Sequence, residues 1–346
     1  MNYYFLLLLF LAILTICWGK IVGFDNLKQN KKYLITIFLI LTLFLALKSK
    51  NVGVDAKSYQ KIFDDISKLS FLDVYNYDRY EIGYKYLCKI ISMIWNNYQF
   101  FLCIVSIIEM VGFYYFIKNY SKNYIFSLFI FVTYDTYIFT FGILRQAISL
   151  SLLLLSIKFL KENKFIKYAT LVIFSSLFHK TALIYILLYP LKYIKLNKKV
   201  MIAFSIAVLL LFLFGDATIR FILEFIYKPA NTTFYSGSGY KLLILLYCFC
   251  MFSFYYKDKL KKLGDYNIDF IKFLMLGTMI QSLSPTFENV GRITLYFIPF
   301  LCIILSNLLE LIKNKKLTFL MFIVLSIYFY IKTNNLFYEL LFQGWC

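Results

Sequence analysis

Residues 141–190 read FGILRQAISLSLLLLSIKFLKENKFIKYATLVIFSSLFHKTALIYILLYP. Arg145 and Gln146 stand at the start of one apolar stretch, and a lysine-rich loop separates it from a second. The only histidine of the chain, His179, lies at the end of the second stretch and is followed by Lys180. Charged side chains at the ends of apolar segments in lipid are costly and usually functional. These four residues are therefore the first candidates for a functional site.

The composition predicts a membrane protein. The chain has 346 residues, of which 61% are hydrophobic, whereas soluble domains are closer to half apolar. Apolar runs of roughly 15 to 20 residues recur along the whole sequence, separated by short lysine-rich loops, as in polytopic helical membrane proteins. We therefore predict an all-α fold, a single integral membrane domain over residues 1–346 that forms a polytopic transmembrane helical bundle.

The basic residues predict the topology. Of the 37 lysines and arginines, 21 lie in six loops, at 20–32, 118–122, 158–167, 192–199, 257–262 and 313–316. Basic loops stay in the cytoplasm, so both termini are expected outside. About twelve spans of membrane-crossing length follow, near 3–18, 33–47, 99–117, 124–141, 143–160, 165–178, 181–194, 200–214, 241–256, 268–283, 293–311 and 317–331. Because the charge of +19 follows the loops and not one surface, we predict no nucleic-acid partner.

The longest segment between predicted spans, 48–98, is expected to be extracytoplasmic and amphipathic. Its first half places Tyr59, Ile62, Phe63, Ile66 and Leu69 at helical spacing, with Asp55 positioned to cap the helix start. Its second half places Tyr84, Leu87, Ile90, Ile91 and Ile94 on one face and Glu81, Lys85 and Lys89 on another. The pattern predicts two helices on the outer membrane surface. The second could instead be a short span, which would invert everything downstream.

A second large outer segment, 215–240, ends in Ser-Gly-Ser-Gly at 236–239. Small residues at the end of a polar segment are typical of a hinge, so we interpret 215–240 as an extracytoplasmic loop and a candidate lid over a cavity.

The polar candidates gather on the outer face of this topology. They are Asp55, Tyr59, Glu81, Arg145, Gln146, His179, Lys180, Glu288, Asn289 and Arg292. Guanidinium groups bind phosphate oxygens through two hydrogen bonds at once, and lysine adds a compact charge. A histidine near carboxylates can move a proton. Each arginine could equally be snorkelling to the headgroups, and the histidine could be an ordinary interfacial residue.

The seven cysteines lie mostly inside apolar runs and form no CxxC pair, and the chain offers one histidine to join them. That pattern supports neither a zinc site nor a disulfide framework. We therefore expect no metal and no cofactor.

Four segments together resemble the EpsG family of bacterial exopolysaccharide proteins, relatives of Wzy-type polymerases. The segments are VGVDAKSYQKIF (52–63), YEIGYKYLCKII (80–91), the stretch 142–191 that holds Arg-Gln and Phe-His-Lys-Thr-Ala, and GRITLYFIPF (291–300). Their order and spacing carry the resemblance over most of the chain.

The resemblance implies a glycosyltransferase of the GT-C type in the bacterial cytoplasmic membrane. Such a polymerase joins repeat units carried on polyprenyl diphosphate, of which undecaprenyl diphosphate is the expected carrier, outside the membrane in exopolysaccharide, capsule or O-antigen synthesis. Arg145, Arg292 and Lys180 would then stabilise the leaving diphosphate without a metal. His179 is the first choice as base, with Asp55, Glu81 and Glu288 behind it, and Tyr59, Gln146 and Asn289 would bind substrate. A chain-length regulator is a candidate partner besides the lipid-linked oligosaccharide and the bilayer.

Three other functions remain open. A flippase for the same lipid-linked sugars would need a site reachable from both faces and often shows two similar halves, which this sequence lacks. A membrane acyltransferase would usually place a histidine toward the cytoplasm. A structural subunit of a synthesis complex would need no site at all.

Overall fold

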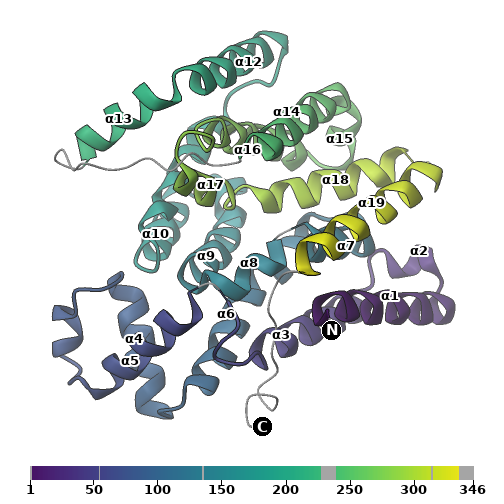
Figure 1. The fold of residues 1–346 in the computed structure, drawn as a ribbon. Coiled ribbons are helices and arrows are strands. Elements are labelled where there is room, and N and C mark those ends of the chain that lie inside the picture. Colours follow the sequence, from purple (N-terminus) through teal and green to yellow (C-terminus); the bar gives the residue numbers. More distant parts are fainter. Residues whose placement is uncertain (1, 54, 135, 227–238, 313–314, 335–346) are drawn as a thin grey trace. The chain divides into compact units, whose positions relative to one another are not determined.

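The computed structural model describes residues 2–53, 55–134, 136–226, 239–312 and 315–334. Every regular element in these ranges is a helix, so the predicted all-α class is confirmed (Figure 1). The chain divides into two compact units: unit 1 is Met1–Ile186 with Lys313–Cys346, and unit 2 is Leu187–Ile312.

Unit 1 contains most of the helices. They are α1 (Tyr3–Val22), α2 (Phe24–Leu27), α3 (Lys31–Ala46), α4 (Ala56–Lys68), the 3-10 helix η1 (Asp73–Asn76), α5 (Ile82–Ile94), α6 (Tyr98–Tyr120), α7 (Tyr124–Thr133), α8 (Thr136–Gly142), α9 (Leu144–Lys161), α10 (Phe165–Ser176) and α19 (Lys315–Asn334). The 3-10 helix η2 (Lys180–Leu187) ends at the unit boundary. Unit 2 holds α11 (Leu188–Lys192), α12 (Lys198–Leu213), α13 (Gly215–Ile226), α14 (Tyr240–Tyr255), α15 (Lys257–Leu263), α16 (Tyr266–Gln281), α17 (Glu288–Thr294) and α18 (Ile298–Ile312).

Asparagines fix where several apolar helices begin. Each accepts, through its side chain, the backbone N–H three residues further on, at 3.0 to 3.3 Å. The five are Asn2, Asn30, Asn97, Asn123 and Asn197. A side-chain oxygen at this position satisfies an N–H that the helix itself leaves unpaired, which is why asparagine is favoured there.

Helix α6 is the centre of unit 1, with α3 and α9 packed along it. Gly112 lets α6 and α9 approach closely, since a Cβ there would lie 2.2 Å from the Ser151 carbonyl oxygen. Ser151 Oγ donates to the Ile108 carbonyl at 2.6 Å and accepts the Gly112 N–H at 3.0 Å. Small residues and hydroxyls at helix crossings are characteristic of helices that pack in membranes.

Two described helices, α1 and α6, are long and apolar enough to span a membrane. The bent pairs α7 with α8 and α12 with Gly215–Phe221 raise the number to four if each pair is one span. Helices do occupy the other predicted spans, but most are short, such as α10 with 12 residues and α18 with 15. The total of about twelve spans therefore stays a prediction.

Three predicted spans are wrong as continuous α-helices. The span at 124–141 is divided into α7 and α8, which meet at an angle of 44°. The span at 181–194 is instead the 3-10 helix η2 followed by the five-residue α11, which contains Pro190. Proline has no N–H and clashes with the carbonyl four residues earlier, so a regular α-helix cannot run through it. The span at 293–311 is broken between α17 and α18, and Pro299 lies in the first turn of α18, where proline is tolerated.

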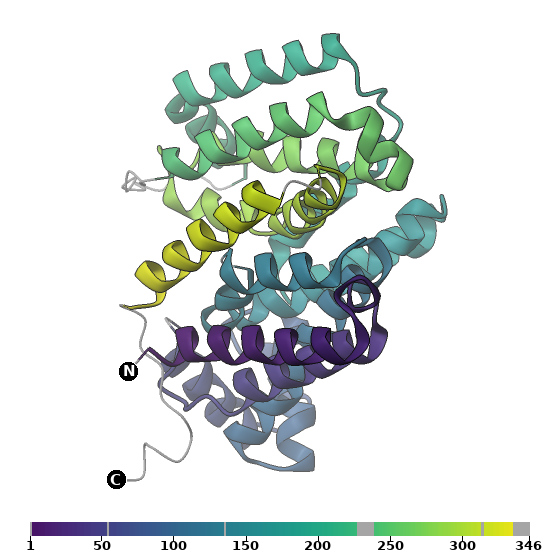
Figure 2. The same cartoon turned by 90° about the vertical axis from the view of Figure 1, so that its right-hand side faces the viewer.

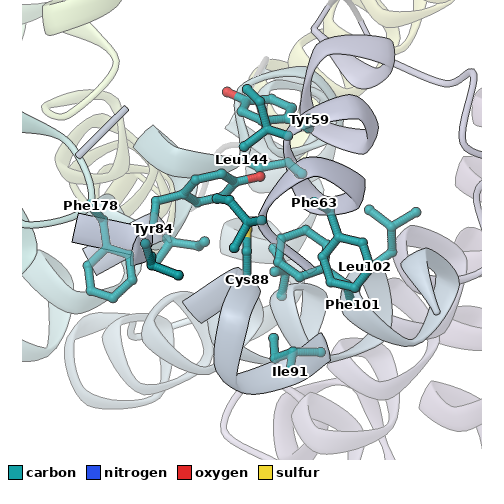
Figure 3. Close-up of a cluster of buried hydrophobic side chains, with 14 residues drawn as sticks. Tyr59, Phe63, Tyr84, Cys88, Ile91, Phe101, Leu102, Leu144 and Phe178 are labelled. Carbon is teal, nitrogen blue, oxygen red and sulfur yellow. The ribbon is translucent and has the colours of Figure 1, made fainter. Parts of the chain in front are cut away.

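The predicted amphipathic segment forms a helical hairpin of α4 and α5. Helix α4 buries Tyr59, Ile62, Phe63 and Ile66, as predicted, but Asp55 at its N-cap makes no side-chain capping bond. These side chains pack against protein in a buried cluster with α5, α6 and the start of α9 (Figure 3). The apolar face of α4 is therefore part of a protein core and not a membrane-facing surface.

The predicted faces of α5 are partly wrong. Lys85 and Lys89 are buried, whereas Ile90 and Ile94 are exposed. The Lys85 ammonium donates to the carbonyls of Tyr75 and Tyr77 at 2.9 and 2.7 Å. The Lys89 ammonium donates to those of Ser67 and Leu69 at 3.1 and 2.6 Å. These carbonyls, at the end of α4 and around η1, take the two ammonium groups as donors and draw both lysines inward.

The candidate lid is only partly described. Residues 215–226 form α13, which meets α12 at an angle of 82° between Lys198–Leu213 and Gly215–Phe221. Residues 227–238, including most of the proposed hinge, lie outside the described residues, as does the C-terminal segment 335–346.

Candidate functional site

The site in unit 1 is built around Arg145, in the first turn of α9. Its Nη1 donates to Glu81 Oε2 in an ion pair whose side chains are only 18% and 12% exposed. Glu81 is the residue that precedes α5. A charge pair shielded from water to this degree is held in one geometry more firmly than a surface pair. The pair therefore joins the start of α9 to the start of α5.

Two tyrosines complete the surroundings of Arg145. The guanidinium carbon lies 3.7 Å from the centre of the Tyr80 ring, so the two planar groups are in contact. The Tyr59 side chain, from α4, lies close to Arg145. Burial raises the pKa of Tyr59 to about 12, against the opposing effect of Arg145, so Tyr59 is a neutral phenol at physiological pH. Arginine is suited to such stacking because its charge is spread over a plane.

Tyr80 adopts a backbone conformation that its residue type rarely takes. Its φ is +66°, in the left-handed region, where a bulky side chain is strained. Its hydroxyl lies 3.2 Å from Ser58 Oγ, and its ring packs on Tyr59 and Tyr84 with centroids 5.8 Å apart in each case. Strain of this kind is retained where the surroundings fix it, often at functional sites. Here it places the ring over Arg145.

Glu81 also fixes the segment that carries His179 and Lys180. Its Oε1 accepts the Lys180 backbone N–H at 3.2 Å, and close by the Gly83 N–H donates to the Leu177 carbonyl at 2.8 Å. A Cβ on residue 83 would lie 2.7 Å from that carbonyl oxygen, so the contact requires glycine. The turn after α10 is thereby placed beside Arg145.

His179 itself is partly buried, and its Nδ1 lies 2.6 Å from Thr181 Oγ1. The Lys180 side chain is exposed. Gln146 is fully buried next to Arg145 in the chain, and Asp55 is close enough to Tyr59 to influence its titration. The structure thus brings Tyr59, Glu81, Arg145 and the backbone of Lys180 together, with Asp55, Gln146 and His179 adjacent to them.

Below this site lies the buried cluster shown in Figure 3. Tyr84 lies in its middle, close to Leu144, the residue before Arg145, and to Phe178, the residue before His179. Aromatic rings and aliphatic side chains pack together in this cluster, and close packing of this kind keeps the residues attached to it in fixed positions. The cluster therefore fixes the positions of α4, α5, α9 and the turn after α10 relative to one another.

Three of the four segments that carry the family resemblance meet at this site. Segment 52–63 supplies Tyr59, segment 80–91 supplies Tyr80, Glu81 and Gly83, and segment 142–191 supplies Arg145 and Lys180. A family model described as the EpsG family matches residues 31–341.

The chain belongs to the EpsG family. No curated protein and no solved structure gives a significant match. The family assignment, together with the apolar helices, indicates a membrane protein with an exopolysaccharide polymerase-like function.

The remaining candidates of this EpsG-family chain lie in unit 2. Glu288 begins α17, and Asn289 and Arg292 on the same helix are exposed. Arg292 therefore belongs to a different compact unit from Arg145, and its meeting Arg145 at one diphosphate stays a prediction.

Sequence reasoning missed Tyr80 and Gly83 as parts of the site. The signal that pointed to them was the YEIGY string at 80–84, in which a glycine inside a helical pattern indicates close approach of another backbone. It also missed the buried Lys48, whose ammonium donates to the Phe141 carbonyl at 2.7 Å.

Among the described residues, no group of three or more His, Cys, Asp or Glu side chains is placed to hold a metal ion.

Proposed function

We propose that the chain is a polysaccharide polymerase, a GT-C-type membrane glycosyltransferase that joins repeat units carried on polyprenyl diphosphate. The observation that carries the proposal is the arrangement of Arg145, with its guanidinium over the Tyr80 ring, bonded to Glu81 and close to Tyr59. Its Nε is buried and has no hydrogen-bond partner among the described residues. A buried donor of this kind calls for a ligand, and phosphate oxygens match the guanidinium fork.

The start of α9 adds to this preference for an anion. No side chain caps the helix, and its start is the positive end of the helix dipole. Helix N-termini bind phosphate through their first backbone N–H groups. Glu81 already accepts one N–H of Arg145, so the diphosphate would use the remaining donors and the Lys180 ammonium.

The reaction is a substitution at carbon. A hydroxyl oxygen of one lipid-linked repeat unit attacks the anomeric carbon at the diphosphate end of the growing chain. A glycosidic C–O bond forms while the bond from that carbon to the diphosphate oxygen breaks, and polyprenyl diphosphate leaves with the electron pair. The hydroxyl proton passes to a base, for which His179 is the first choice, with Asp55, Glu81 and Glu288 behind it. Arg145, with Arg292 and Lys180, stabilises the developing diphosphate charge without a metal.

The wider setting belongs to the same proposal. The chain would cross the bacterial cytoplasmic membrane about twelve times, a number set by the basic loops, with the site facing the outside. Gln146, Tyr59 and Asn289 would contact substrate. Undecaprenyl diphosphate is the expected carrier, the product would be a capsule, O-antigen or related exopolysaccharide, and a chain-length regulator is the expected protein partner.

The test is a polymerisation assay with purified protein in lipid nanodiscs and the lipid-linked repeat unit, read as a ladder of product lengths on a gel. We expect Arg145→Ala and Arg292→Ala each to slow chain extension by a factor on the order of 100 to 1,000. Arg145→Lys is expected to recover little, because an ammonium has no fork and no stacking plane. Arg79→Ala is the matched control, since Arg79 is an exposed arginine beside Tyr80.

Normal product ladders from both Arg145→Ala and Arg292→Ala would contradict the proposal. Substrate that stays a single repeat unit but crosses a liposome bilayer would show a flippase. A repeat unit that gains only an acyl group would show an acyltransferase.

A further inference from the structure

Unit 1 carries a groove that the proposed reaction has not used. It has a volume of about 390 Å³ and is lined by side chains of α1, α3, α7 and α19. Small-molecule sites usually occupy roughly 300 to 1,000 Å³, so the groove is large enough to hold part of a ligand. Figure 2 shows α1 running alongside α3, which forms one side of it.

The walls of the groove are apolar. Leu8, Ala12, Ile37, Phe129 and Phe322 contribute to them. Three hydroxyl side chains also line the groove, those of Thr15, Tyr33 and Ser326, and the first two are paired inside the protein, as the next contacts show.

Thr15 Oγ1 donates to the Leu11 carbonyl at 2.7 Å and lies 2.8 Å from the Tyr33 hydroxyl. Both hydroxyl groups are thus satisfied inside the protein, and a ligand has no need to hydrogen-bond them. An apolar ligand is favoured because it costs no polar desolvation here.

The groove opens toward lipid. Helix α1 is a membrane-capable helix of which only 22% is buried inside the protein, and its groove residues Leu9 and Ile16 are 45% and 49% exposed. Water is absent from the hydrocarbon core of a bilayer, so a groove on this face is filled by a hydrocarbon chain.

One end of the groove leads to the site around Arg145. Phe5 lines that end, and the preceding residue, Tyr4, packs edge-on against Phe141 with ring centroids 5.4 Å apart. Phe141 lies at the end of α8, and it lines one narrow pocket together with Tyr59 and with Leu144, the residue before Arg145. The polar site and the apolar groove are therefore neighbours within the same unit, as the head and tail of one lipid would require.

We propose that this groove binds the isoprenoid tail of the lipid-linked substrate whose diphosphate Arg145 holds. The inference rests on the proposed function. From Phe5 to Ile16 the groove follows α1 for roughly 16 Å at 1.5 Å per residue, which is about half of the 30 Å hydrocarbon core. It thus holds the part of the tail nearest the diphosphate, and the rest of the tail lies in the bilayer.

The test is photocrosslinking in nanodiscs of phosphatidylglycerol, with a polyprenyl diphosphate that carries a diazirine in its tail as the probe. Labelled peptides are mapped by mass spectrometry, with and without excess unlabelled polyprenyl diphosphate. We expect label on α1 and α19 that the unlabelled compound displaces. This part of the experiment needs no variant, so it holds even if a variant fails to fold.

Ala12→Phe fills the groove and is expected to weaken labelling roughly tenfold. In the polymerisation assay it should raise KM and leave kcat near that of the unchanged protein. Ile13→Phe is the matched control, because Ile13 is on the same helix, is 60% exposed and does not line the groove. Ile13→Phe should change neither the labelling nor the KM.

Label on α1 and α19 that polyprenyl diphosphate does not displace would overturn the inference, because it would mean that ordinary acyl chains fill the groove. Equal labelling in Ala12→Phe and the unchanged protein would overturn it too. An unchanged KM in Ala12→Phe, together with lost extension in Arg145→Ala, would refute the groove alone. If unlabelled polyprenyl diphosphate displaces the label but the protein makes no ladder, the polymerase function is refuted and the binding of the tail in the groove is supported.

Discussion

At the scale of single residues, the site depends on how Arg145 is held. The sequence predicted Arg145, Glu81 and Tyr59 as candidates but could not predict that they touch. Glu81 is 64 residues from Arg145, and the contact exists only because α5 and α9 pack on the same buried cluster. A single sequence shows residue types and local spacing, and neither of these reports a tertiary ion pair.

Tyr80 provides a test of this arrangement. Tyr80→Ala removes the ring that contacts Arg145, so we expect chain extension to fall by roughly tenfold, the equivalent of a cation–π contact of about 1.4 kcal/mol. Tyr80→Phe keeps the ring and loses only the hydroxyl contact with Ser58, so its rate should stay close to normal. The rates are measured by the gel assay.

The positive φ of Tyr80 adds a second expectation. Tyr80→Gly removes the ring as alanine does but relieves the backbone strain, which costs about 1 to 3 kcal/mol. Tyr80→Gly should therefore extend chains as slowly as Tyr80→Ala does, and it should unfold at a higher temperature than Tyr80→Ala. If Tyr80→Ala extends chains at the normal rate, the stacking contact has no part in the function.

At the scale of elements, the hairpin of α4 and α5 shows what periodicity can and cannot predict. The buried face of α4 followed from the spacing of its apolar residues. The faces of α5 did not, because Lys85 and Lys89 point inward to loop carbonyls. A lysine has an apolar stem and three donors, so its charge alone does not tell whether it faces water.

We expect Lys85→Met and Lys89→Met each to destabilise this hairpin. Each substitution removes the donor of two part-buried carbonyl bonds and should cost about 1 to 3 kcal/mol. Lys61→Met is the control, because Lys61 is exposed on the neighbouring helix α4. The measurements are the thermal unfolding temperature in detergent and the rate of chymotryptic cleavage between residues 69 and 80.

Faster cleavage in both inner-lysine variants and not in Lys61→Met would support the role given to them. Unchanged cleavage in all three would show that the loop is held by other contacts.

Helix starts were more predictable from the sequence than the predicted spans suggest. Asn30, Asn97, Asn123 and Asn197 each precede an apolar run and cap it in the structure. The predicted spans began two residues late at α3 and α12, one residue late at α6 and at the correct residue at α7, because hydropathy responds to the apolar side chains and not to the cap. A prediction that located the N-cap asparagines before the apolar runs would have found the starts of these helices.

At the scale of the whole molecule, the basic loops predict about twelve spans by the positive-inside rule. Among the described residues, two to four helices meet the length and hydropathy expected of a span. Helix α3 illustrates the difference. It has 16 residues, or about 24 Å at 1.5 Å per residue, against a hydrocarbon core of about 30 Å. Lys31 and Lys32 at its start could reach the headgroups with their long stems, and the bilayer can thin locally, so a crossing is physically feasible.

Labelling of single cysteines decides whether α3 crosses. In a variant whose native cysteines are replaced, Lys20→Cys and Asp78→Cys place thiols at exposed positions before and after α3. With the N-terminus outside and both α1 and α3 crossing, a membrane-impermeant maleimide added to intact cells should label residue 78 at once, and residue 20 only after permeabilisation. If α1 crosses and α3 does not, both thiols stay protected, because both lie in the cytoplasm. That outcome would move Glu81 and the site around Arg145 to the inner face, where lipid-linked repeat units are made and not joined, and the polymerase proposal would fail together with the topology.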